Sequence, residues 1–429
     1  MRVLAPFAAL LISTALLITG HGLQNALVPL RGEAEAFGSF WVGGLGSGYF
    51  LGFALGCVLA PVLVARAGHI RVFAALVGLA SGTLLFYPLF LEAWFWVLLR
   101  VITGFCLAGL YIIIESWLNE RTDNANRGLV LSVYVIINFA TVTFGQLLLI
   151  VYPLNSFALF TLASILVSFA AIPLALSRAT QPAPLVAVRL NLRRLYQNSP
   201  IGLIGIFVIG IVQSTFWTFG GVFASRSGLD TNQVAVFMSV AVAAGALSQW
   251  PLGRLSDTMD RRTVLLGLLL VSTGVAIAIY IGAPADLRQL LMSGFVFGLA
   301  TLPAYAIAIA HAYDHAEADQ HVTMASGLLL TYALGSIIGP LAASGFLNQL
   351  GPGGLFLFMG LAQAALAAYV FARLQVHDGV PEEEKEDFSF AATAQMGTVL
   401  AETNLEDQDV DLIEPEPVIF VSEEDENSP

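Results

Sequence analysis

Residues 93–118, AWFWVLLRVITGFCLAGLYIIIESWL, form an apolar run that is long enough for one transmembrane helix and carries only two charges, Arg100 and Glu115. A charge in such a run costs about 2.5–3.5 kcal/mol on insertion scales, so it usually faces a protein interior or a water-filled cavity. One side of the predicted helix, within roughly 60° around its axis, carries Arg100, Gly104, Tyr111 and Glu115. Arg100 and Glu115 are about 22 Å apart along this axis and cannot pair, so each needs another partner, a water or a substrate.

The composition predicts an integral membrane protein. The chain has 429 residues, of which 57% are hydrophobic and 11% charged, and its mean hydropathy is +0.80. The net charge is +4 over residues 1–377 and −16 over residues 378–429, so a weakly basic membrane body carries an acidic tail. No basic block indicates nucleic-acid binding. The two cysteines, Cys57 and Cys106, lie in apolar runs, which excludes a disulfide framework.

The hydropathy pattern predicts twelve transmembrane helices. They fall at approximately 6–30, 41–64, 72–91, 93–117, 128–151, 155–177, 201–224, 232–253, 263–283, 287–311, 323–347 and 353–374. The first run could also be a signal peptide after Arg2, but its length and the lack of a small-residue cleavage site favour a transmembrane helix. With both termini in the cytoplasm, fourteen basic residues lie inside, and only Arg31, Arg226 and Arg288 lie outside.

These helices divide into two similar halves. We expect a six-helix bundle at 1–177, a cytoplasmic linker at 178–199 and a second bundle at 200–375. Gly104 and Tyr111 recur 194 residues later as Gly298 and Tyr305, and the GLVL of 128–131 recurs as the GLLL of 327–330. Two such halves predict a pseudo-symmetric transporter with its binding site at the midplane between them.

The tail, 376–429, is acidic and contains scattered Pro and Ser, which predicts a disordered cytoplasmic segment. Two apolar islands, 396–400 and 418–421, leave a second interpretation open, in which the tail docks on a partner or on the cytoplasmic face of the chain.

The loops after the second and eighth helices carry a repeated motif. The later copy reads GRLSDTMDRR over 253–262, and the earlier one reads PVLVARAGHIR over 61–71. The pair resembles the signature of the major facilitator superfamily, which implies a cytoplasmic gate latch. The matching latch residues are Arg66, Asp257, Arg261 and Arg262. The earlier copy lacks the glycine and the aspartate, so the latch is expected mainly in the second half; a purely topogenic loop is the alternative.

The fourth helix extends this resemblance, which covers roughly 4–374. RVITG at 100–104 resembles the family's fourth-helix motif, in which the arginine is often implicated in proton coupling, and 93–150 is similar to the YcaD-type branch of transporters, which has no defined substrate. The resemblance implies a multi-pass secondary transporter of the bacterial inner membrane that moves a small molecule by alternating access.

Two buried charges are candidates for coupling. A desolvated carboxylate can load and release protons near neutrality, and Glu115 is the only acid that we place inside a span. A structural ion pair of Glu115 with Arg121 or Arg127 is the alternative. Arg100 could bind an anionic substrate, tune a carboxylate or act as a structural hydrogen-bond hub.

Polar and aromatic side chains within the spans are candidates for a substrate cavity. His21, Gln24 and Asn25 share one helix face. Tyr111 of the fourth helix is a further candidate, and the weaker ones are Tyr49, Asn138, Gln146, Gln213, Trp217, Gln249, Trp250, Tyr305 and Tyr332. Such a lining suits a neutral or amphipathic small molecule.

The remaining patterns are less specific. His311 and His315 could bind a metal, but a solvated cytoplasmic loop over 311–321 is the preferred interpretation. No phosphate-binding loop, nucleophile elbow or hydrolytic carboxylate pair is present, so we predict no enzyme, no cofactor and no metal site. The sequence therefore predicts a monomeric transporter in the lipid bilayer, with proton coupling left open. The alternative is a non-transporting scaffold or sensor that works through its acidic tail.

Overall fold

The computed structural model describes residues 7–120, 122, 124–176, 192–282, 286–315 and 321–376. Within these ranges, twelve spans are long and apolar enough to cross a membrane, as the sequence predicted. The acidic tail and most of the expected linker lie outside the described residues.

The first six spans consist of α1 (Ala8–Ala34), α2 (Gly38–Ala67), α3 (His69–Phe86), α4 (Ala93–Glu120), α5 (Asn124–Leu147) with the short η2 (Leu148–Ile150), and α6 (Ala158–Phe169) with α7 (Ala171–Ala175). A short helix, α8 (Leu192–Asn198), lies in the expected linker and precedes the second set. The last six spans consist of α9 (Pro200–Arg226), α10 (Thr231–Thr258), α11 (Arg261–Gly282), α12 (Leu287–Thr301) with α13 (Ala304–Tyr313), α14 (His321–Leu350) and α15 (Gly354–Leu374).

Local sequence signals set several of the helix ends. Ser199 caps α9 by accepting a hydrogen bond from the Gly202 amide, and Pro200 occupies the first turn. At α10, Asp230 and Gln233 form a reciprocal capping box. Gly68 has a φ of +83°, which separates α2 from α3 by a sharp turn.

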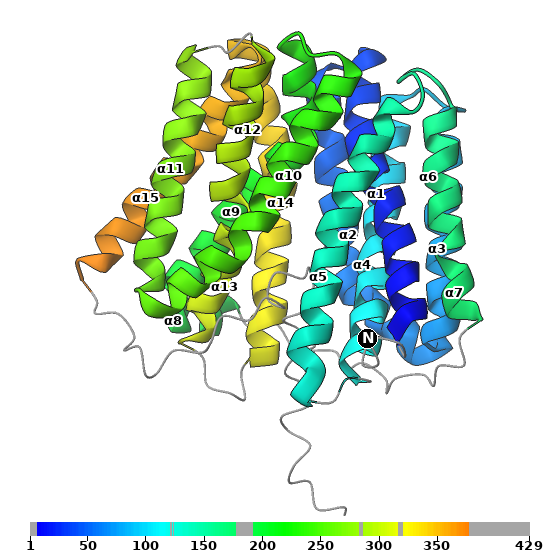
Figure 1. Cartoon of the computed structure of the whole chain (residues 1–429), viewed down its shortest axis with the longest axis horizontal. Coiled ribbons are helices and arrows are strands. Elements are labelled where there is room, and N and C mark those ends of the chain that lie inside the picture. The colour runs from blue at the N-terminus through cyan, green and yellow to red at the C-terminus, as the bar shows by residue number, and fades with distance from the viewer. Residues whose placement is uncertain are drawn as a thin grey trace, which may run out of the picture.

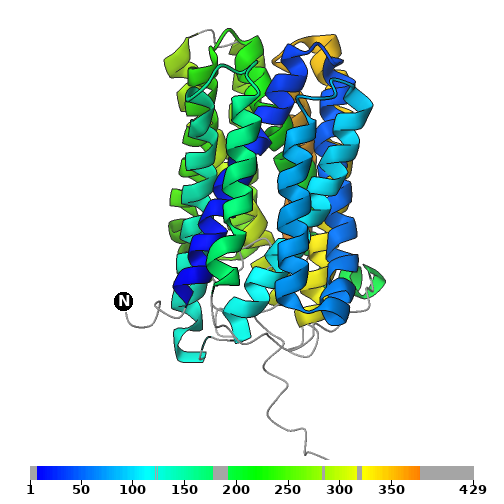
Figure 2. The ribbon, with the colours of Figure 1, turned by 90° about the vertical axis from the view of Figure 1, so that its right-hand side faces the viewer.

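The helices form two groups. Figure 1 shows α1–α7 on one side of the bundle and α8–α15 on the other, and Figure 2 shows that both groups run between the same two ends. Glycines 194 residues apart make equivalent crossings. A Cβ at Gly104 would collide with the Tyr49 carbonyl of α2, and one at Gly298 would collide with the Ala241 carbonyl of α10. The repeat seen in the sequence therefore corresponds to the same helix packing in both halves.

The two halves are joined toward the end of the bundle that is formed by the α1–α2 and α9–α10 loops, here named the closed end. Arg226 of α9 binds Glu33 of α1 across the halves at this end. A Cβ at Gly43 of α2 would lie 2.7 Å from the Pro340 carbonyl oxygen of α14. The opposite end, here named the arginine end, holds the α2–α3 and α10–α11 loops with Arg66, Arg71, Arg254, Arg261 and Arg262.

Candidate functional site

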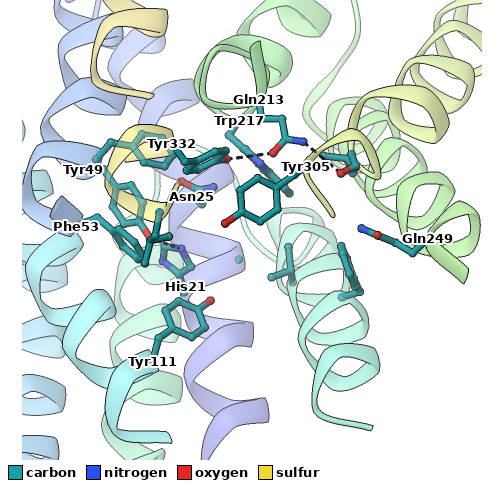
Figure 3. A pocket seen from close by; sticks show the side chains of 16 residues that line it. His21, Asn25, Tyr49, Phe53, Tyr111, Gln213, Trp217, Gln249, Tyr305 and Tyr332 are labelled. Atoms are coloured by element: carbon teal, nitrogen blue, oxygen red, sulfur yellow. Dashed lines mark hydrogen bonds between the residues drawn. The ribbon is translucent and has the colours of Figure 1, made fainter. Parts of the chain in front are cut away.

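A cavity lies between the two halves, with about 970 Å³ of empty space including the part that is open to solvent. Helices of both halves supply its wall, and the wall contains aromatic, amide and imidazole groups but no Asp, Glu, Arg or Lys among the described lining residues. Figure 3 shows these side chains converging from several helices. The lining residues are His21, Gly22, Asn25, Tyr49, Phe50, Phe53, Tyr111, Phe139, Val142, Gln213, Trp217, Gln249, Leu302, Tyr305, Leu329 and Tyr332.

The wall from the first half is organised around Arg100. The guanidinium donates from Nη2 to Oδ1 of Asn25 at 3.0 Å and from Nε to the Leu45 carbonyl at 3.2 Å. Its central carbon lies 4.6 Å from the centre of the Tyr49 ring, and the Tyr49 hydroxyl lies 3.3 Å from Nε2 of His21. Arg100 therefore does not line the cavity itself, but it directly contacts two residues that do, Asn25 and Tyr49, and Tyr49 in turn contacts His21.

The wall from the second half carries two amides and two phenols. Tyr332 donates a hydrogen bond to Oε1 of Gln213 at 3.2 Å, and its ring packs edge-on against Tyr305 with 5.0 Å between the centroids. Gln249 is buried, and its Oε1 has no hydrogen-bond partner among the described residues. An unpaired buried amide oxygen is costly, so Gln249 is suited to accept a hydrogen bond from a bound solute.

The cavity brings together most of the residues that the sequence nominated for it. Three polar ones are placed elsewhere. Gln24 donates to the Thr103 hydroxyl of α4 at 3.3 Å, Asn138 bonds to the Tyr134 carbonyl of its own helix, and Gln146 is buried outside the lining. Helix α5 presents Phe139 and Val142 to the cavity instead. Their polarity had suggested these three residues, but helix rotation decides which side chain faces the cavity.

Sequence reasoning missed the apolar part of the lining, whereas Gln249, one of the weaker candidates, does line the cavity. Phe50, Phe53, Leu302 and Leu329 carry no sequence signal that separates them from core residues. Trp250, which is adjacent to Gln249, is 60% exposed and stacks under Arg254 on the outer surface of α10.

Glu115 lies close to the cavity but does not line it. Its side chain is fully buried, and Oε1 accepts a hydrogen bond of 2.9 Å from the Tyr134 hydroxyl of α5. Tyr111, one helical turn earlier, does line the cavity. The side chains of Arg121 and Arg127 lie outside the described part of the chain, and so does the predicted ion pair with either of them.

A partly buried charge cluster surrounds the loop between α10 and α11. Arg261 is 2% exposed and lies 2.9 Å from Asp314 and 3.4 Å from Asp257. The adjacent Arg262 pairs with Asp260 at 2.7 Å. Partial burial raises the pKa of Asp260, but the hydrogen bonds from Arg262 outweigh this effect and hold it below the ordinary value of 3.8.

The solvated-loop interpretation of 311–321 is wrong for two of its residues. His311 lies within α13 and is buried, and the Asp314 side chain is only 2% exposed because it pairs with Arg261. Packing against the start of α11, where Arg261 lies, rather than sequence polarity decides their environment. Among the described residues, no three His, Cys, Asp or Glu side chains gather as a metal site.

The equivalent loop after α2 is built differently. Arg66 is exposed and forms no ion pair with another described residue. His69, at the position that matches Arg261, is buried, and its ring lies 5.8 Å from that of Trp117 on α4. The charge cluster is thus confined to the second half in the described part of the chain.

Bacterial relatives match most of the chain. An uncharacterised MFS-type transporter of Enterobacter sp. (strain 638) is 28% identical over 347 residues, which cover 78% of this chain and 87% of the relative. The uncharacterised MFS-type transporter YcaD of Escherichia fergusonii is 29% identical over 340 residues, covering 77% and 86%.

Solved structures share the fold. A bacterial homologue of the human lysosomal transporter Spinster, in an inward-facing and occupied conformation, aligns with a TM-score of 0.72 at 15% identity, covering 90% of this chain and 98% of that one. The nucleoside transporter NupG aligns with a TM-score of 0.71 at 14% identity, covering 87% and 100%. The family profile described as Major Facilitator Superfamily matches residues 10–287 and 202–402, and the chain belongs to this superfamily of transporters.

Proposed function

We propose that the chain is a secondary active transporter that moves a small, uncharged solute through the cavity by alternating access. The supporting observation is the wall of the cavity, to which both halves contribute hydrogen-bonding groups without a charged side chain. A site shared by two repeats can be opened alternately to the two sides when the repeats move against each other.

The chemistry of the wall indicates the class of solute. Tyr305, Tyr332 and Trp217 offer ring faces, while Gln213, Gln249 and Asn25 offer amides. A cavity of this kind favours a molecule with a flat or apolar face and a hydrogen-bonding edge. An ionic solute would lose its hydration shell there without gaining a charged partner.

In this proposed cycle, the conformation is one that is closed toward the outside. The Glu33–Arg226 pair and the Gly43–Pro340 contact join the halves toward the closed end. The positive-inside distribution of arginine assigns the arginine end to the cytoplasm of a bacterial cell, so the closed end faces outward.

Glu115 is the proposed site of proton coupling. It is a fully buried carboxylate next to a phenol donor and one helical turn from the cavity-lining Tyr111. Protonation there removes a charge from the interior of the first half, which favours a conformation that buries this region further.

A ligand screen by thermal shift tests the assignment of the site, with hits confirmed by counterflow in proteoliposomes. A ligand that binds the folded protein raises its melting temperature. Gln249→Leu is the test variant and Gln363→Leu its matched control, because both glutamines are buried in the second half with an unpartnered Oε1, and only Gln249 lines the large cavity. A hit should bind the Gln249 variant roughly 10-fold more weakly and the Gln363 variant normally. Equal binding to all three proteins would place the site elsewhere.

Accumulation driven by a pH gradient tests the coupling. Glu115→Gln should retain counterflow but lose uphill accumulation, whereas Glu92→Gln, which alters an exposed carboxylate just before α4, should retain both. Uphill accumulation by the Glu115 variant would exclude this carboxylate as the proton site. Removal of residues 378–429 tests the scaffold alternative, because a transporter retains counterflow without its tail.

A further inference from the structure

The tenth span is interrupted beside the cavity. Helix α12 ends at Thr301 and α13 begins at Ala304, with Leu302 and Pro303 between them. Pro303 has no N–H, so the Leu299 carbonyl one turn earlier loses its usual helical donor. The hydroxyl of Ser248 on α10 donates to this carbonyl instead, at 3.0 Å.

Gln213 of α9 satisfies two further carbonyls at the interruption. Its Nε2 donates to the Thr301 carbonyl at 2.9 Å and to the Leu302 carbonyl at 3.3 Å. In the described chain, neither oxygen accepts a hydrogen bond from an α13 backbone N–H. Backbone groups inside a membrane protein must be satisfied, and here the Gln213 side chain satisfies two of them at the joint between the helices.

The same side chain is part of the cavity wall. Oε1 of Gln213 accepts the hydrogen bond from Tyr332, which Figure 3 shows as a dashed line. Leu302 and Tyr305, on either side of the start of α13, also line the cavity. A solute that competes for the Gln213 amide would therefore disturb the joint directly.

The far end of α13 reaches the charge cluster at the arginine end. Asp314 directly follows α13 and pairs with Arg261. Helix α13 has 10 residues, so it is a rod of about 15 Å that joins the cavity wall to this cluster. In the first half, the equivalent helix α4 runs unbroken from Ala93 to Glu120, so this interruption has no counterpart there.

We propose that Leu302–Pro303 is a hinge about which α13 moves as a separate segment, and that Gln213 is the positioning residue that links occupancy of the cavity to this hinge. The proposal rests on the proposed function for the identity of the cavity. The hinge itself is a property of the chain without ligand, so the hinge can be confirmed or refuted independently of transport.

Hydrogen–deuterium exchange of the full chain in nanodiscs, without ligand, tests the hinge. Gln213→Leu removes the two hydrogen bonds from Nε2 to the Thr301 and Leu302 carbonyls and should speed exchange of the α13 amides at least 5-fold. Pro303→Ala restores an N–H for a continuous helix and should slow exchange of the same amides. Gln363→Leu is the matched control, because Gln363 bonds to the Thr301 hydroxyl rather than to the backbone, and it should leave α13 exchange within 2-fold of wild type.

Opposite changes in the first two variants support the hinge, and they cannot both arise from general misfolding. Unchanged exchange in Pro303→Ala, or equal acceleration in the Gln213 and Gln363 variants, would overturn it. If the exchange results hold but the ligand screen finds no cavity ligand, the hinge stands and the proposed function fails. If ligands bind the cavity but α13 exchange is insensitive to both variants, the hinge alone fails.

Discussion

The guanidinium of Arg226, at the end of α9, holds the carboxylate of Glu33, near the end of α1, through hydrogen bonds of 2.7 and 2.9 Å. The two residues are 193 positions apart and belong to different halves. Arg226 also donates to the Ser39 hydroxyl of α2 at 3.1 Å. A single side chain thus ties α9 to both α1 and α2 at the closed end, and the pair must separate before that end can open.

Glu33→Gln should shift the conformational equilibrium toward opening of the closed end. Both side chains are about a quarter exposed, so we expect the pair to contribute no more than about 1 kcal/mol, or roughly a 5-fold change in populations. Spin-label distances between the α1–α2 and α9–α10 loops measure this shift. Glu35→Gln is the matched control, because Glu35 pairs with Arg31 of its own half. An equal shift in both variants would show that the Glu33–Arg226 pair does not hold this end.

The buried pair at the arginine end should contribute far more to stability. Asp314→Asn leaves the Arg261 guanidinium buried without its closest carboxylate, and removal of one partner from a buried pair costs about 3–5 kcal/mol. We expect the low end of that range because Asp257 remains 3.4 Å away. Thermal unfolding in nanodiscs measures the loss. Asp260→Asn, which breaks the more exposed pair with Arg262, should cost about 1 kcal/mol or less. A similar loss in both variants would contradict the assigned burial.

The fold could be predicted from the sequence because the signals for it, the apolar runs and the glycine repeat, are strong and local. Twelve apolar runs were predicted, and the described residues contain twelve spans, although the predicted ends differ by several residues. Helix α1, for example, continues to Ala34 rather than ending near residue 30. Capping and interfacial charges decide where a helix ends, and hydropathy reports them poorly. The 194-residue repeat was also readable, since close helix crossings require glycine at Gly104 and Gly298.

The site could be predicted only in part. Its composition depends on how each helix is rotated and on contacts between residues that are far apart in the sequence. Gln24 and Asn25 are neighbours in sequence, yet Asn25 lines the cavity and Gln24 contacts α4. The Glu33–Arg226 pair joins positions for which no local pattern exists. Pro303 was the one available sign of the interrupted tenth span, because a proline inside a helical run removes a backbone donor.

The Asp260–Arg262 pair should make stability depend on pH only in acid. The pKa of Asp260 is held below 3.8 in the folded chain, so the folded state binds this proton less tightly than the unfolded state. The resulting stabilisation is fully present above the ordinary pKa and is lost as the pH falls through the lowered one. Melting temperatures from pH 7 to pH 3 should show a constant gap between wild type and Asp260→Asn down to about pH 5 and a shrinking gap below about pH 4. If the gap in melting temperature widened in acid, the pKa of Asp260 could not be lowered in the folded chain.

The glycine crossings give a test of the repeat itself. Gly104→Ala and Gly298→Ala each drive a Cβ into a backbone carbonyl of the neighbouring helix, which cannot rotate away as a side chain could. We expect each to cost about 3 kcal/mol or more, measured as lost monodisperse protein and a lower melting temperature. Gly82→Ala is the matched control, because a Cβ there meets no atom within 4 Å, and the change should be neutral or slightly stabilising in a helix. Similar losses of stability at Gly104 and Gly298 are expected if the two halves use the same helix packing. A tolerated alanine at either position would mean that the two crossings are not equivalent, because a rigid carbonyl can be accommodated only if the helices move apart.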